Sequence, residues 1–95
     1  PDVTFPGMEV RIPYPGSTAE GVERLVTRPV EEALATLPGI EEIRSTSTSE
    51  MAAFRLQLGW DRPIDAAAFD VRTKIDAIRS QLPPDADRVF VFTFS

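Results

Sequence analysis

Apolar residues recur every second residue in some segments of the chain and every three or four residues in others. The order in which these segments follow one another restricts the fold more than any other feature. Four segments alternate apolar with other residues, as strands do: 8–14, 40–45, 52–60 and 90–95. In two further segments the apolar residues recur three and four apart, as in helices that bury one face: 17–37 and 64–82. The chain therefore predicts strand, helix, strand, strand, helix, strand.

This order is that of the ferredoxin-like split βαβ fold. It is an α+β fold in which one four-stranded antiparallel sheet carries both helices on one face. The first and third strands are expected at the centre of the sheet. Ninety-five residues suffice for one small domain, so we expect a single unit over 1–95.

Local signals place the joints between these segments. Pro15-Gly16 follows the first strand and predicts a turn, and Ser17 with Glu20 has the form of a capping box at the start of a helix. Pro29 lies inside the helical pattern, where it is expected to kink the helix. Trp60 falls on the apolar side of the clearest strand and is expected to pack in the core.

Composition excludes several kinds of site. The formal net charge is −5, which disfavours a nucleic-acid partner. The chain has no cysteine and no histidine, so it lacks thiolate metal ligands and the commonest general base. Pairs such as Glu31-Glu32 are expected on a solvated face. We therefore expect no catalytic residues, no metal site and no cofactor. The chain opens on Pro1, which suggests a fragment of a longer protein.

Several stretches together resemble one transporter family. "YPGSTAEGVERLVTRPVEEALATLPGIEEIRSTSTS", "FRLQLGW", "DAAAFDVRTKIDAI" and "LPPDA" resemble the first periplasmic stretch of resistance-nodulation-division (RND) efflux transporters. One departure is Ser49-Glu50-Met51-Ala52, where that family often has glycine just before the third strand. The resemblance covers nearly the whole chain and implies the first of four porter subdomains, each a split βαβ unit, in the periplasmic part of an inner-membrane protein.

The resemblance also implies function and partners. The parent would be a homotrimer that exports amphiphilic molecules in exchange for protons, together with a periplasmic adaptor and an outer-membrane channel. The subdomain would pack against other porter subdomains of the same chain and move as a rigid body. It would form part of the substrate groove and of the central pore.

Two features mark candidate positions for these contacts. If the apolar alternants face the helices, then Arg11, Arg55 and Gln57 share the opposite sheet face; the resemblance makes that face a wall of the substrate groove. Phe69 lies off the apolar stripe of the second helix. The resemblance makes this helix part of the pore, so Phe69 is a candidate subunit contact.

Other readings remain open on the sequence alone. A free-standing ferredoxin-like module that binds a small molecule or another protein would have the same fold, because that fold serves many functions. A solvated sheet face and a harmless surface aromatic are the simpler interpretations of Arg11, Arg55, Gln57 and Phe69. A small hydrolase is weakly supported, since Arg11 and Arg55 lack an evident Asn or His partner.

Overall fold

The structure is a computed structural model that describes residues 5–94, and it has the predicted order of elements. The strands are β1 (Gly7–Pro13), β2 (Ile40–Thr48), β3 (Met51–Leu58) and β4 (Phe90–Phe94). The helical segments are α1 (Ala19–Val22), η1 (Glu23–Thr27), α2 (Arg28–Leu34), α3 (Ile64–Ala77) and the short η2 (Arg79–Gln81). All strand pairs are antiparallel, in the order β2-β3-β1-β4. The ferredoxin-like prediction is confirmed.

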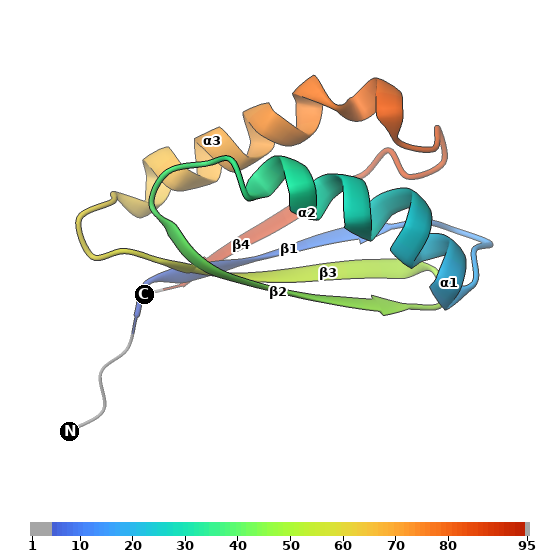
Figure 1. Cartoon of the computed structure of the whole chain (residues 1–95), viewed down its shortest axis with the longest axis horizontal. Coiled ribbons are helices and arrows are strands. Elements are labelled where there is room, and N and C mark those ends of the chain that lie inside the picture. Colours follow the sequence, from blue (N-terminus) through green and yellow to red (C-terminus); the bar gives the residue numbers. More distant parts are fainter. Residues whose placement is uncertain (1–4, 95) are drawn as a thin grey trace.

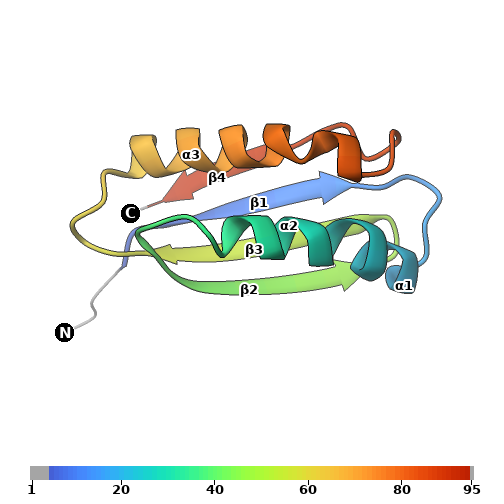
Figure 2. The same ribbon diagram turned by 45° about the horizontal axis from the view of Figure 1, so that its top comes forward.

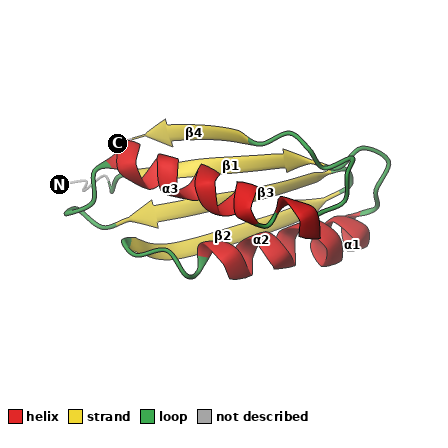
Figure 3. Ribbon diagram, turned by 90° about the horizontal axis from the view of Figure 1, so that it is seen from above, coloured by secondary structure: helices red, strands yellow, loops and turns green. Residues whose placement is uncertain are grey.

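The molecule has two layers: the helices cover one face of the sheet, and no element formed by residues 5–94 covers the other (Figures 1 and 2). Seen from above, α1, α2 and α3 all lie in front of the strands (Figure 3). The central strands send every second side chain into the core between the layers: Met8, Val10, Ile12, Ala52, Phe54, Leu56 and Leu58 are buried. Residues between them face the uncovered side, which we call the open face.

The first helical stretch of the chain is irregular because it contains a proline, Pro29. Pro29 has no N–H to donate, and the Arg28 N–H bonds to the Glu23 carbonyl, five residues back. The resulting π-helical segment η1 keeps residues spaced by four on one side: Val22, Val26, Val30 and Leu34 are all fully buried. In a regular α-helix this spacing would drift by about 40° at each step.

The turn after β1 is held by the hairpin between β2 and β3. Gly16 adopts a φ of 82°. The Tyr14 N–H donates to the Glu50 carbonyl at 2.9 Å, and the Glu50 N–H donates to the Ser17 carbonyl at 3.1 Å. The helix starts one residue later than predicted, because Thr18 is its N-cap and accepts from the Gly21 N–H. The turn at Tyr14–Gly16 therefore fixes the start of helix α1 against the turn between β2 and β3.

Glu50 occupies a left-handed conformation, with φ of 65°, where a side chain is strained. We expect Glu50→Gly to raise the free energy of unfolding by roughly 0.5–1 kcal/mol, since relief of left-handed strain outweighs the extra entropy of glycine. The matched change Glu32→Gly, at an exposed position of helix α2, should instead lower the free energy of unfolding by about 1 kcal/mol. Urea unfolding of the three proteins measures both effects. A loss of stability at both positions would show that the Glu50 turn is unstrained.

The prediction for Trp60 is wrong. Strand β3 ends at Leu58, and the Gly59 N–H turns to bond the Gly39 carbonyl at 3.0 Å. Trp60 therefore lies beyond the strand, is 64% exposed, and packs its ring against Phe5 with centroids 5.3 Å apart. The alternation in the sequence continues past the point where glycine ends the strand.

Candidate functional site

The open face brings together the three groove candidates. Arg11 comes from β1, and Arg55 and Gln57 come from β3, which pairs with β1. In the register Glu9 lies opposite Arg55 and Arg11 lies opposite Ala53. Both arginines are exposed and Gln57 is half-buried. The structure thus places all three side chains on the sheet face away from the helices.

Three phenylalanines of β4 also lie on this face. The alternating pattern of the sequence did not show that they would point away from the helices. In the pairing with β1, Phe90 lies opposite Arg11, Phe92 opposite Glu9 and Phe94 opposite Gly7. Their exposed fractions are 43%, 53% and 39%. The smaller Val91 packs on the core instead. The open face is therefore amphipathic, with a row of aromatic rings on the edge strand beside charged residues.

Two shallow hollows adjoin on the open face and share Arg55 and Phe94. One has a volume of about 270 Å³ and is lined by residues of β1, β2, β3 and β4, among them Arg44 and Gln57. The other, of about 340 Å³, lies between Arg11, Arg55 and Phe92. Together they contact each of the three groove candidates. A ligand in either hollow would meet both an aromatic ring and a guanidinium.

A carboxylate organises the arginines of the central strands. Glu9 accepts from Arg55 at 2.8 Å and from Arg11 at 2.5 Å. Hydrogen bonds from Arg55, and then from Arg11, lower the pKa of the Glu9 carboxyl, so it stays ionised further into the acid range than an ordinary glutamate. The Arg55 guanidinium also lies over the Phe94 ring, 5.3 Å from its centroid, as in a cation–π contact. These contacts fix Arg55 at the wall shared by the two hollows.

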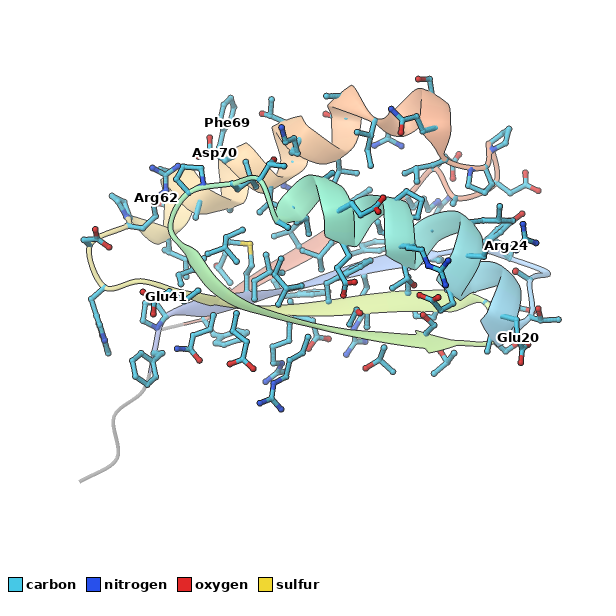
Figure 4. All side chains as sticks on the ribbon, viewed as in Figure 1. Glu20, Arg24, Glu41, Arg62, Phe69 and Asp70 are labelled. Carbon is cyan, nitrogen blue, oxygen red and sulfur yellow. The ribbon has the colours of Figure 1, made fainter. Side chains whose placement is uncertain are left out.

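Phe69 lies on the opposite side of the molecule. Helix α3 buries Val71 and Ile75 against the sheet, while the Phe69 ring points away from it and is 68% exposed (Figure 4). Beside it, Asp70 forms an ion pair with Arg62 of the loop before the helix. The structure therefore separates Phe69 from Arg11, Arg55 and Gln57 by the thickness of both layers.

Neither metal-binding clusters nor membrane-crossing helices occur in the part of the chain that the structure describes. Among residues 5–94, histidine, cysteine and acidic side chains form no group of three or more that could hold a metal ion. No helix in this range has the length and apolar character needed to cross a bilayer. The hollows of the open face are lined by aromatic rings, guanidinium groups, carboxylates and an amide.

Comparison with known proteins decides the family. All of residues 1–95 match the model of the AcrB/AcrD/AcrF family. The chain belongs to this family of RND efflux transporters. The resemblance to RND proteins found in the sequence is thereby confirmed.

Three relatives of this RND chain share one name. "Multidrug resistance protein MdtC" of Edwardsiella ictaluri (strain 93-146) is 39% identical over 83 residues, which cover 87% of this chain. Proteins of the same name from Salmonella arizonae (strain ATCC BAA-731 / CDC346-86 / RSK2980) and Shigella flexneri are each 36% identical over 83 residues and 87% of this chain. The match spans 8% of the length of each of these relatives. The chain thus corresponds to a small part of proteins named for multidrug resistance.

Proposed function

We propose that this domain is the first periplasmic porter subdomain of a proton-driven RND exporter of amphiphilic compounds, and that its open face forms part of the substrate groove. The observation that carries the proposal is the exposed row Phe90, Phe92 and Phe94 beside Arg55. Contiguous exposed apolar surface marks a site of contact with another molecule or domain. Family membership and the name of the relatives favour an exporter over a free-standing module or a hydrolase.

The parent protein supplies the rest of this proposal. It would lie in the inner membrane and work as a homotrimer with a periplasmic adaptor and an outer-membrane channel. The domain would pack against the other porter subdomains of its own chain, which would form the opposite wall of the groove. The domain itself would form one wall of the substrate groove and move as a rigid body. Proton transfer would take place elsewhere in the parent protein.

The groove role is tested in the full-length transporter that contains this chain. We expect Arg55→Ala and Gln57→Ala to change the inhibitory concentrations of some exported compounds about fivefold, because a contact worth about 1 kcal/mol is lost for those compounds alone. Arg24→Ala is the matched control, since Arg24 is exposed on η1. Growth assays with several compounds in a strain without other exporters measure the profile. Unchanged resistance to every compound, at normal protein levels, would remove the groove assignment.

We further propose that Phe69 contacts a neighbouring subunit at the central pore of the trimer. A phenylalanine that is 68% exposed on an isolated domain has most of its ring available for burial. Phe69→Ala should weaken association of the full-length protein by about 2 kcal/mol, or roughly thirtyfold, as for a buried aromatic contact. Phe69→Leu, which keeps apolar volume, should restore much of it. Mass photometry across a dilution series measures the trimer fraction; an unchanged fraction for Phe69→Ala would exclude the contact.

A further inference from the structure

Two arginines lie directly opposite each other on the open face. In the pairing of β2 with β3, Arg44 is the partner of Arg55, and the two side chains are 78% and 64% exposed. Like charges in this position repel each other and destabilise a sheet. The pair also lines the smaller of the two hollows. A positively charged pair beside a hollow offers a site for an anion.

The glutamates on this face compensate the arginines only in part. Glu42 accepts from Arg44 at 2.6 Å, and Glu9 is shared between Arg55 and Arg11. A guanidinium has five N–H donors, whereas Arg44 and Arg55 each use one nitrogen in these bonds. Among the described residues the strands thus present three arginines and two glutamates here, although the whole chain carries a net charge of −5. These five side chains carry a net charge of +1 on one face of an acidic domain.

Apolar surface lies next to these donors. Phe94 lines both hollows and lies beneath the Arg55 guanidinium, and Phe92 lines the larger hollow. A ligand with its charged end at the arginine pair would therefore place its apolar body over these rings. An anion would satisfy donors that the glutamates leave free, whereas a cation there would meet two guanidinium groups. The arginine pair and the phenylalanine rings together suit a molecule that has an anionic end and an apolar body.

We propose that the open face selects amphiphiles whose polar end is an anion, with Arg44 and Arg55 binding that end and Phe92 and Phe94 contacting the apolar body. This inference rests on the proposed groove function and names the substrate class of the same site. Carboxylates and sulfates both suit it, because each accepts two parallel N–H bonds from a guanidinium. Quaternary ammonium compounds of the same size are expected to gain nothing from the arginines.

The test compares two detergents that share a twelve-carbon tail: dodecyl sulfate and dodecyltrimethylammonium. Cells without other exporters would express the full-length transporter, and growth-inhibitory concentrations would be measured for the parent, Arg44→Gln, Arg55→Gln, Phe94→Ala and the control Arg24→Gln. We expect each open-face arginine variant to lose about tenfold in tolerance of dodecyl sulfate, the value of one charge-assisted hydrogen bond. Tolerance of dodecyltrimethylammonium should stay at the parental value in both.

The outcomes separate the two proposals. If Phe94→Ala lowers tolerance of both detergents while the arginine variants change neither, the face is a groove without selection for anions, and the present inference fails alone. An equal loss for both detergents in Arg44→Gln and Arg55→Gln, at parental protein levels, also overturns it. If no open-face variant changes either value while the parent protects against both, the groove function itself fails. Immunoblots give the protein levels, and Arg44→Gln on the edge strand serves where Arg55→Gln is poorly expressed.

Discussion

Replacing Phe54 by alanine is expected to unfold much of this domain, whereas the same change at Phe69 is expected to have little effect on its stability. Among residues 5–94, Phe54 is the largest fully buried side chain, and its loss leaves a cavity that costs about 3–5 kcal/mol. A domain of this size has about 5–15 kcal/mol in total. Because Phe69 is mostly in water, Phe69→Ala should change the free energy of unfolding by less than about 0.5 kcal/mol.

Urea unfolding of the isolated 95-residue chain, followed by far-UV circular dichroism, compares the two variants. The pair is matched, since each change removes one phenylalanine ring from the same protein. A large loss for Phe69→Ala would place that ring in the core and end the proposal of a pore contact. A small loss for Phe54→Ala would contradict the packing of the two layers described above.

Gly7→Ala is expected to destabilise the domain by roughly 1–3 kcal/mol, the range for overpacking a filled site. A Cβ atom at Gly7 would lie 2.7 Å from the Leu56 carbonyl oxygen and 2.9 Å from the Phe94 ring carbon Cε2. The first contact is with backbone, so β1 and β3 must shift, and the second displaces the ring beneath Arg55. This close approach, and not the dihedral angles of Gly7, excludes larger residues at that position.

A double-mutant cycle with Phe94→Ala tests this explanation. Removing the ring relieves one of the two clashes, so the double variant Gly7→Ala/Phe94→Ala should cost less than the sum of the single changes. Urea midpoints of the four proteins give the coupling energy. An unchanged midpoint for Gly7→Ala, or strictly additive costs, would mean that Gly7 is not confined by these two groups.

The elements that the sequence predicts well are those in which one face of a strong pattern is buried. Strand β3 alternates over its whole length, and its apolar residues are buried as expected. Helix α3 likewise buries Val71 and Ile75 of the predicted stripe. In β3 and in α3 one face is much more hydrophobic than the other. The spacing of the apolar residues is therefore enough to predict which face is buried. Arg55 and Gln57 were placed on the open face by this reasoning.

Strand β4 shows where the same reasoning fails. Its sequence Phe-Val-Phe-Thr-Phe has three phenylalanines on one side and Val91 and Thr93 on the other, so hydrophobicity favours burial of the phenylalanines, yet they face away from the helices. The register with β1 decides, because it aligns Phe92 with the outward Glu9 and Val91 with the buried Val10. Register depends on pairing between distant segments, which no local pattern contains. The aromatic part of the candidate site therefore became visible only in the structure.

The pairing of β1 with β4 also determines how force would reach this domain from a longer polypeptide. Gly7 and Phe94 are register partners, so the chain enters and leaves on neighbouring strands at one end of the sheet. Neighbouring strands are about 4.8 Å apart. The start of β1 and the end of β4 therefore lie close together, an arrangement that allows a domain to be inserted into another chain. Tension between these two points would open the β1–β4 ladder one hydrogen bond at a time, from the end inward. Because these bonds would be loaded in turn and not together, a pull at Gly7 and Phe94 would separate the edge strand β4 from the rest of the sheet.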